Sequence, residues 1–392
     1  KDLILHIHEY IRCEYGRNLD NVFYDVTNYY FESDEDNFRI KGVSKEHRPN
    51  PIVQMGLLMD DEGIPISFKL FEGNTNDCNT LMPVLDELKK DFNLGRVIVV
   101  ADKGMNTGEN IAYNVIHKNG YIYSKSVRGS SKEVKDYVLN ANDYKDMGDE
   151  YKFKSRVVNT NIWITNAKGK KVQVEIEQKQ VVFYSEKYAR KARKDRQKVL
   201  DKANKLIKLK KGSLNKGAYK YIKDEYLDRE TGEILEKGDY LYIDEDRIAE
   251  EEKYDGYYLI VSSELNMPDR EIIERYKGLW KIEESFKITK SQLKSRPVYV
   301  RKKGHIEAHF FICFLALILI RLLEKETNYE FSISELINSI KNLSVTYLDE
   351  NYYMLDYADD VSKSFSNILN TDITKRFWKQ SDIKNLIANS KK

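Results

Sequence analysis

The chain has 392 residues, with 65 basic and 63 acidic residues and a net charge of +2. Hydrophobic residues make up 41% of it, enough to bury a sizeable core, so wholesale disorder is excluded. The three cysteines are far apart, which excludes a disulfide scaffold and a zinc ribbon. The longest apolar run, residues 310–320, is much shorter than the roughly 20 residues of a membrane span and predicts a buried helix. No secretion signal is recognisable, and because the chain starts at Lys1 inside a predicted helix, we expect that an N-terminal portion is missing.

Positive charge is concentrated in two segments. Residues 187–211 hold twelve Lys or Arg against two Asp, and residues 285–304 hold seven Lys or Arg and no acid. Because the total charge is near zero, the rest of the chain is acidic, and two basic patches on an acidic body are typical of proteins that dock a polyanion. A Lys-rich helix that is merely solvated explains either patch about as well.

Residues 19–127 alternate between strand and helix signals. A turn signal at 60–63 joins two strands into a hairpin, and the continuous apolar run 97–101 predicts a strand covered on both faces. The expected elements are strands at 22–31, 52–59 and 65–71, a helix at 79–92, a strand at 97–101, a helix at 107–118 and a strand at 121–127. This order predicts a mixed α/β sheet.

The character of the sequence changes after residue 127. Strand-like segments at 156–165 and 171–184 suggest a separate β-rich unit, and the basic segment 187–211 predicts a helix. The elements expected after it are a strand at 257–263, long helices at 269–290 and 304–325, and a helical tail from 331. In the tail, Ser332 and Glu335 have the spacing of a capping box.

Asp25 occupies an unusual position in the first predicted strand. It lies mid-strand on the same face as Phe23, Thr27 and Tyr29, where an unpaired carboxylate is costly. The structural alternative is a carboxylate bonded to a neighbouring turn or to an Arg. Asp25 is therefore a candidate for chemistry as well as for packing.

Asp102 directly follows the apolar strand 97–101. In an open α/β sheet, ligands gather just beyond the carboxyl ends of the strands, so this position also suggests a functional acid. A turn aspartate ahead of Gly104 is the structural alternative.

The predicted helix 269–290 carries an acid on its apolar side. At about 100° per residue, Glu283 lies within roughly 20° of Tyr276, near the middle of the apolar stripe, whereas Glu284 lies at its edge. Glu283 is therefore expected to point at whatever the helix packs on. A buried ion pair between Glu283 and Lys287 is the structural alternative.

Three acids in such positions suggest one site. Clustered carboxylates repel each other, so a cation is their natural partner, and hard oxygen ligands select Mg²⁺ or Mn²⁺. Two such ions can clamp the attacking and leaving oxygens of a phosphodiester. The basic segment 285–304 begins on the same helix as Glu283 and is placed to hold the flanking phosphates.

Other candidate residues have structural explanations. Asp77 precedes the helix 79–92 and is expected to cap it, and Asp255 precedes Gly256 and is expected to serve a turn. His305 and His309 lie one turn apart, but packing or phosphate contact is expected of them rather than zinc binding.

Four segments carry the most specific motifs: VFYDVTNYYF (22–31), GIPISFKLFEGNTNDCNTL (63–81), VIVVADKGMNTGENI (97–111) and YKGLWKIEESFKITK (276–290). Their order, their strand or helix context and the long interlude between them resemble the DDE transposases of bacterial insertion sequences, of the insertion-sequence-four type. The resemblance implies an α/β fold with a ribonuclease H-like mixed sheet flanked by helices, interrupted by a β-rich insertion domain. It also implies a division into a remnant of an N-terminal helical region (1–18), the first part of the core (19–127), a β-rich insertion with a basic helix (128–250), the second part of the core (251–330) and a helical C-terminal tail (331–392).

Carried over by position, Asp25, Asp102 and Glu283 would be the catalytic triad, binding two Mg²⁺ or Mn²⁺ ions. The residues expected to contact DNA are Tyr276, Lys287, Lys290, Lys294 and Arg296. Tyr276 and Lys290 match the tyrosine and lysine that the family shows around the glutamate.

Two residues beside Glu283 are open questions. Leu279 stands where the family commonly has arginine, so a nearby lysine, Lys277, Lys281 or Lys287, would have to contact that phosphate. Trp280 is expected to pack in the core rather than to stack on a base.

The resemblance also implies the reaction and the partners. An activated water would cut double-stranded DNA at the element's terminal inverted repeats, and the freed 3′-hydroxyl would then attack target DNA. The expected setting is a homodimer in the synaptic complex, in the cytoplasm on the nucleoid and without a membrane. The family's N-terminal region for recognising the ends is not evident. A related metal-dependent nuclease and a catalytically silent, DNA-binding remnant are the alternatives.

Overall fold

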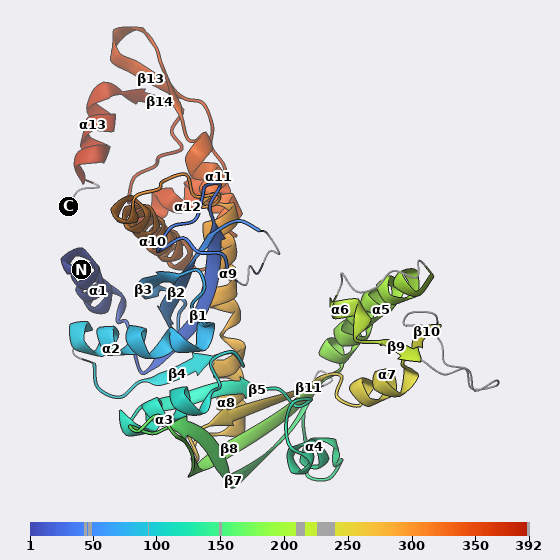
Figure 1. Ribbon diagram of the computed structural model, residues 1–392. Helices are drawn as coiled ribbons and strands as arrows, with labels where there is room; N and C mark the ends of the chain where they lie inside the picture. The colour runs from blue at the N-terminus through green and yellow to red at the C-terminus, as the bar shows by residue number, and fades with distance from the viewer. Residues whose placement is uncertain are drawn as a thin grey trace. The chain divides into compact units, whose positions relative to one another are not determined.

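The computed structural model describes residues 1–42, 45, 49–92, 94–148, 151–208, 216–225 and 240–389 (Figure 1). The chain divides into two compact units: unit 1 comprises Lys1–Val97 and Gly278–Lys392, and unit 2 comprises Ile98–Lys277. Both units combine strands and helices, which confirms the predicted α/β class. Residues 209–211 of the predicted basic segment and 390–392 of the predicted tail lie outside the described residues.

Unit 1 contains an antiparallel sheet in the order β3-β2-β1. The predicted hairpin is confirmed, because β2 and β3 pair across the turn that follows Asp60. The elements before residue 98 are α1 (Asp2–Tyr15), β1 (Asn21–Tyr30), β2 (Ile52–Asp60), β3 (Pro65–Glu72), the short 3₁₀ helix η1 (Asp77–Asn79) and α2 (Leu81–Phe92). Those after residue 277 are α9 (Trp280–Ser291), α10 (Lys303–Glu326), α11 (Ile333–Asn342), β12 (Val345–Tyr347), η2 (Asp349–Asn351), β13 (Tyr352–Leu355), α12 (Asp360–Ile368), β14 (Phe377–Lys379) and α13 (Gln380–Asn389).

Aromatic side chains join the sheet of unit 1 to α10. The rings of Tyr29 on β1 and Phe310 on α10 meet edge to face at 4.8 Å, and those of Phe68 on β3 and Phe314 lie 5.0 Å apart. All residues of β2 are buried, because it is the middle strand and side chains cover both of its faces. The core of unit 1 therefore lies between this sheet and the helices packed on it.

The helix α10 has the length and composition of a membrane span. A helix in the core of a soluble protein can have the same length and composition. In this structure, Phe310, Phe314 and Leu317 are fully buried. Ile312 and Leu319 are exposed on its other side. The apolar run thus forms part of the core of unit 1, as its sequence predicts.

Unit 2 contains a mixed sheet in the order β4-β5-β11-β8-β7-β6, in which β4 and β5 are parallel and the other neighbours are antiparallel. Its elements are β4 (Ile98–Ala101), α3 (Gly108–Ile116), β5 (Gly120–Lys125), α4 (Lys132–Leu139), β6 (Lys145–Gly148), β7 (Tyr151–Thr165), β8 (Lys171–Ser185), α5 (Glu186–Lys208), α6 (Lys216–Tyr219), β9 (Ile222–Glu225), β10 (Tyr240–Ile243), α7 (Glu245–Glu252), β11 (Tyr257–Ser262) and α8 (Asp269–Lys277).

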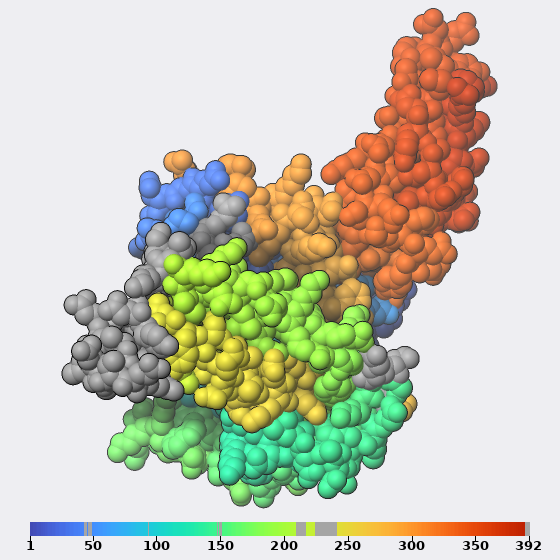
Figure 2. Space-filling model, turned by 90° about the vertical axis from the view of Figure 1, so that its right-hand side faces the viewer, coloured from blue at the N-terminus to red at the C-terminus, as the bar shows by residue number. Residues whose placement is uncertain are grey.

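The hairpin β7–β8 extends this sheet instead of forming a sheet of its own. The C-terminal half of β8 pairs with β11 and is buried, whereas its N-terminal half, toward the hairpin turn, is mostly exposed. The sequence could not show this pairing, because the partner strand lies more than 70 residues further along the chain. After the hairpin, α5 lies at the surface of unit 2 (lime green in Figure 2).

The tail from residue 331 is helical only in part. The strands β12, β13 and β14 form a small antiparallel sheet among the helices α11, α12 and α13. The predicted capping box is confirmed: Ser332 Oγ accepts from the backbone N–H of Glu335, and the Glu335 carboxylate accepts from that of Ser332.

Candidate active site

Asp25 lies in the middle of β1. The residues on either side of it in this strand, 21–24 and 26–29, are buried. Val, Tyr and Phe make this segment a strand, and it pairs with β2, where Leu57 lies opposite Asp25. Asp25 itself is half-buried, and its Oδ1 accepts a 2.7 Å hydrogen bond from the backbone N–H of Val26. The structure therefore keeps this carboxylate within reach of solvent in an otherwise buried strand.

The predicted helix 269–290 is two helices. α8 ends at Lys277 and α9 begins at Trp280, with Gly278 and Leu279 between them. α8 packs on strands of unit 2, whereas α9 packs on β1 and α10 of unit 1, so the face that α8 buries is not the face that α9 buries. Glu283 is exposed. The expectation that Glu283 lies in the middle of the buried stripe is therefore wrong.

The same break accounts for two neighbours of Glu283. Trp280 is 56% exposed, so the expectation that it packs in the core is also wrong. Leu279 is buried, so it belongs to the packing of unit 1. The buried residues of α9 are Ile282, Ser285, Phe286, Ile288 and Thr289.

Glu283 shares a face of α9 with Lys290. Seven residues along a helix of 100° per residue place the two within about 20° of each other, two turns apart. Lys290 Nζ donates a 2.7 Å hydrogen bond to Thr27 Oγ1 on β1, and its ammonium lies 5.4 Å from the centre of the Tyr29 ring. The face of α9 that carries Glu283 is therefore also the face whose lysine reaches the Asp25 side of β1.

Two further contacts hold α9 alongside β1. Near the C-terminal end of the strand, the hydroxyls of Tyr29 and Thr289 lie 2.8 Å apart. At the other end, Lys281 donates to the carbonyl of Asp61, and Asp61 follows Asp60, the partner of Val22 in β1. Asp25 and Glu283 both lie between these two contacts, one on the strand and one on the helix.

Two ammonium groups surround the Asp25 side of β1. The pKa of Lys290 is lowered to about 8, chiefly by burial and also by the nearby Lys45, while Asp25 opposes both effects. Lys45 donates to the carbonyl of Val26 and lies 3.6 Å from the carboxylate of Asp77. Sequence reasoning missed Lys45, because nothing in the pattern around it indicates that its side chain contacts β1.

Asp102 follows β4, as predicted, at the carboxyl end of a strand that runs parallel to β5. It is exposed, and its Oδ1 accepts a 2.7 Å hydrogen bond from the backbone N–H of Gly104. A Cβ on residue 104 would lie 3.0 Å from that oxygen, so glycine permits this turn. The turn role of Asp102 is thus observed, and its exposed carboxylate is also available to a ligand.

The three predicted acids are divided between the units: Asp25 and Glu283 belong to unit 1 and Asp102 to unit 2. In the part of the chain that the structure describes, no group of three or more His, Cys, Asp and Glu side chains is arranged to hold a metal ion. The donor chemistry does fit a divalent cation, because all three side chains are carboxylates and none is fully buried. The triad therefore stays a prediction.

The other predicted DNA contacts are accessible to different degrees. Lys287 and Lys294 are exposed, and Tyr276 and Arg296 are half-buried. Three lysines are proposed to replace the family's arginine at position 279. Of these, Lys277 has its ammonium 4.3 Å from the centre of the Tyr151 ring, and Lys281 donates a hydrogen bond to the carbonyl of Asp61. Lys287 is the exposed one of the three, which favours it for a phosphate contact.

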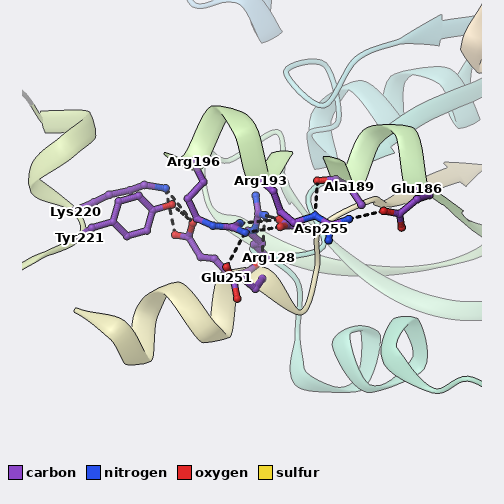
Figure 3. A network of polar contacts seen from close by, with 10 residues as sticks. Arg128, Glu186, Ala189, Arg193, Arg196, Lys220, Tyr221, Glu251 and Asp255 are labelled. Atoms are coloured by element: carbon purple, nitrogen blue, oxygen red, sulfur yellow. Dashed lines mark hydrogen bonds and ion pairs between the residues drawn. The ribbon is translucent and has the colours of Figure 1, made fainter. Parts of the chain in front are cut away.

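Asp255 does more than serve a turn. It is buried and receives two hydrogen bonds from Arg196 of α5, at 2.9 and 2.6 Å, and a third from Arg128 at 2.9 Å (Figure 3). Its hydrogen bonds raise the pKa of Arg196. Asp255 is thus the anchor of the basic helix, a role that its position before Gly256 could not indicate.

The sequence profile of the transposase DDE domain matches residues 33–319. The chain belongs to the transposase DDE domain family. Asp102 and Glu283 lie inside the matched range, whereas Asp25 lies before it. This family typically uses divalent metal ions, which agrees with the donor chemistry of the three carboxylates.

Among solved structures, a piggyBac transposase synaptic complex with hairpin DNA is similar to this transposase domain at a TM-score of 0.39 and 8% sequence identity. The similarity covers 82% of this chain and 52% of that one, so this chain spans about half the length of that transposase. No curated protein matches the sequence.

Proposed function

We propose that the protein is a transposase that cleaves DNA at the ends of an insertion sequence and joins the freed ends to target DNA, in a reaction that depends on divalent metal ions. One observation carries the proposal: in a chain of the transposase DDE domain family, Lys290, which lies on the same side of α9 as Glu283, donates a hydrogen bond to Thr27, two residues from Asp25 on β1. The alternatives are a nuclease that never rejoins DNA and a silent remnant that only binds it.

Asp25, Asp102 and Glu283 would hold two Mg²⁺ or Mn²⁺ ions. When bound, such ions activate water and stabilise the charge that develops on the attacking and leaving oxygens. Carboxylate oxygens suit these hard cations, and the exposure of Asp102 and Glu283 leaves room for DNA to approach. The ammonium group of Lys290 lies close enough to Asp25 for the carboxylate to raise its pKa, against the larger lowering by burial.

Basic residues on and after α9 would orient the DNA. Lys287 and Lys294 are exposed and would contact backbone phosphates, together with Lys290, Arg296 and Tyr276. Lys290 is tied to Thr27, so a phosphate held by it would lie beside Asp25. Such contacts position the scissile bond and do not read its sequence.

The proposal has consequences for the whole protein. Joining two ends implies a homodimer bridging them, working on the nucleoid in the cytoplasm. Residues 128–250 would be the insertion between the second aspartate and the glutamate of a ribonuclease H-like core. The insertion-sequence-four type is part of this proposal.

The test is a joining assay with the full chain. Duplexes carrying the inverted repeats that flank the coding sequence are incubated with a target plasmid and Mg²⁺, and we expect both cut ends and ends joined to the plasmid. If the DNA is cut but not joined to the plasmid, the result supports the nuclease instead. If the DNA is bound but not cut, the result supports the silent remnant. Chelation by EDTA should abolish both products.

A further inference from the structure

The helix α5 carries a straight row of lysines. At about 100° per residue, they fall within a sector of about 80° on the helix surface, over 18 residues or roughly 27 Å. All of them are exposed. This lysine ridge consists of Lys187, Lys191, Lys194, Lys198, Lys202 and Lys205.

The buried face of α5 lies opposite the lysine ridge. Ala189, Arg196 and Ala203 are its buried residues, and they lie about 180° from the middle of the ridge. Ala189 packs closely on Gly256, where a Cβ would lie 2.8 Å from the Ala189 Cβ. Arg196 binds Asp255 through two hydrogen bonds, and these contacts fix the rotation of α5 about its axis (Figure 3). The ridge is therefore held facing outward.

Folding does not explain the lysine ridge. Consecutive ridge lysines are three or four residues apart, and like charges at this spacing repel each other. Of the three acids of α5, Glu186 pairs with Arg193 away from the ridge, Asp195 pairs with Lys198 at 3.0 Å, and Asp201 accepts a 3.0 Å hydrogen bond from Gln197. A helix stabilised by its own ion pairs would place an acid opposite most of these lysines. The excess positive charge therefore calls for an anionic partner.

We propose that the lysine ridge binds the sugar–phosphate backbone of duplex DNA, independently of its sequence. Its length and straightness match a stiff polyanion, and ammonium groups bind phosphates as point charges. The ridge positions hold no aromatic residue on which the bases of a single strand would stack. This contact lies outside the candidate active site and requires no catalysis.

Binding is measured by fluorescence anisotropy with a labelled 30-base-pair duplex of random sequence, in EDTA and over a range of salt concentrations. The full chain is compared with the triple variant Lys187→Gln, Lys194→Gln and Lys202→Gln. Because each lost phosphate contact removes about 0.9 from the slope of log K against log salt, the slope should fall by roughly 2 to 3. The matched control is Lys168→Gln, Lys170→Gln and Lys171→Gln, which removes the same charge from the exposed hairpin turn of unit 2.

We expect the ridge variant to bind at least about tenfold more weakly at 100 mM salt, and the control to bind like the unchanged chain. An unchanged slope in the ridge variant, or an equal loss in the control, overturns the proposal. So does tighter binding of single-stranded DNA or RNA than of the duplex. Circular dichroism checks that α5 stays helical, and because the probe lacks element ends and the buffer lacks metal, the outcome does not depend on the proposed transposition.

Discussion

Lys290 Nζ donates a 2.7 Å hydrogen bond to Thr27 Oγ1, two residues along β1 from Asp25. Around the axis of α9, the exposed Glu283 lies within about 20° of Lys290, two turns earlier.

Glu283 and Glu284 should differ sharply in their importance. Glu283→Gln removes a proposed metal ligand from an exposed position, so we expect DNA cleavage to fall by about 100-fold or more without loss of thermal stability. Glu284 instead accepts a 3.0 Å hydrogen bond from Arg321, so Glu284→Gln should leave cleavage intact and cost about 1 kcal/mol of stability. Gel-based cleavage assays and thermal melting of both variants measure this. Equal loss of cleavage in the two variants would contradict the assignment of Glu283.

DNA binding should respond to pH through Lys290. Its pKa is lowered to about 8, so the ammonium is charged at pH 7 and largely neutral at pH 9. A phosphate contact made by Lys290 is therefore lost as pH rises through this range, and the affinity should fall several-fold. Lys290→Arg keeps its charge and should remove that fall, because the guanidinium does not lose its proton in this range. Anisotropy titrations between pH 6.5 and 9 compare the two, and a fall of the same size in Lys290→Arg would exclude Lys290 as its source.

The Arg196–Asp255 pair should dominate the stability of unit 2. Both side chains are almost fully buried, at 5% and 6% exposure. Asp255→Ala leaves the Arg196 charge buried without its main partner, which should cost about 3 to 5 kcal/mol. The double variant Arg196→Met with Asp255→Leu removes both charges and should recover most of that loss. Urea unfolding followed by circular dichroism measures the free energy of unfolding of each variant. An unchanged value for Asp255→Ala would show that the pair does not anchor α5.

Metal binding should stabilise the folded chain. If the three acids bind Mg²⁺, a concentration of ten times the dissociation constant adds about 1.4 kcal/mol to the free energy of unfolding. Thermal melting with and without Mg²⁺ detects this as a rise in Tm. Asp102→Asn should abolish the rise while keeping the Tm of the metal-free chain, since Asp102 is exposed. A rise that survives in Asp102→Asn would place the metal elsewhere.

Much of the fold follows from local patterns. The hairpin of β2 and β3, the helix α2, the buried strand β4 and the capping box of α11 are all predicted from short-range signals, and the structure contains each of them. These features depend on spacing within one element or between adjacent ones. Interactions within a short stretch of the sequence are therefore sufficient to specify these features.

The position of Glu283 shows where such patterns fail. α8 packs within unit 2 and α9 within unit 1, so the two helices bury different faces, and Trp280 and Glu283 are both exposed. A stripe counted from one helix into the next assigns faces wrongly, because the elements on which each helix packs decide which of its faces is buried.

The sequence by itself determined the α/β class, the family resemblance and the candidate acids, because residue types and their spacing express them directly. Only the tertiary structure decided that Lys290 binds Thr27, that Asp255 anchors Arg196, and that the hairpin of β7 and β8 joins the sheet of β11. These contacts join residues dozens to hundreds of positions apart. Their free energy comes from burial and pairing that no local window of sequence contains.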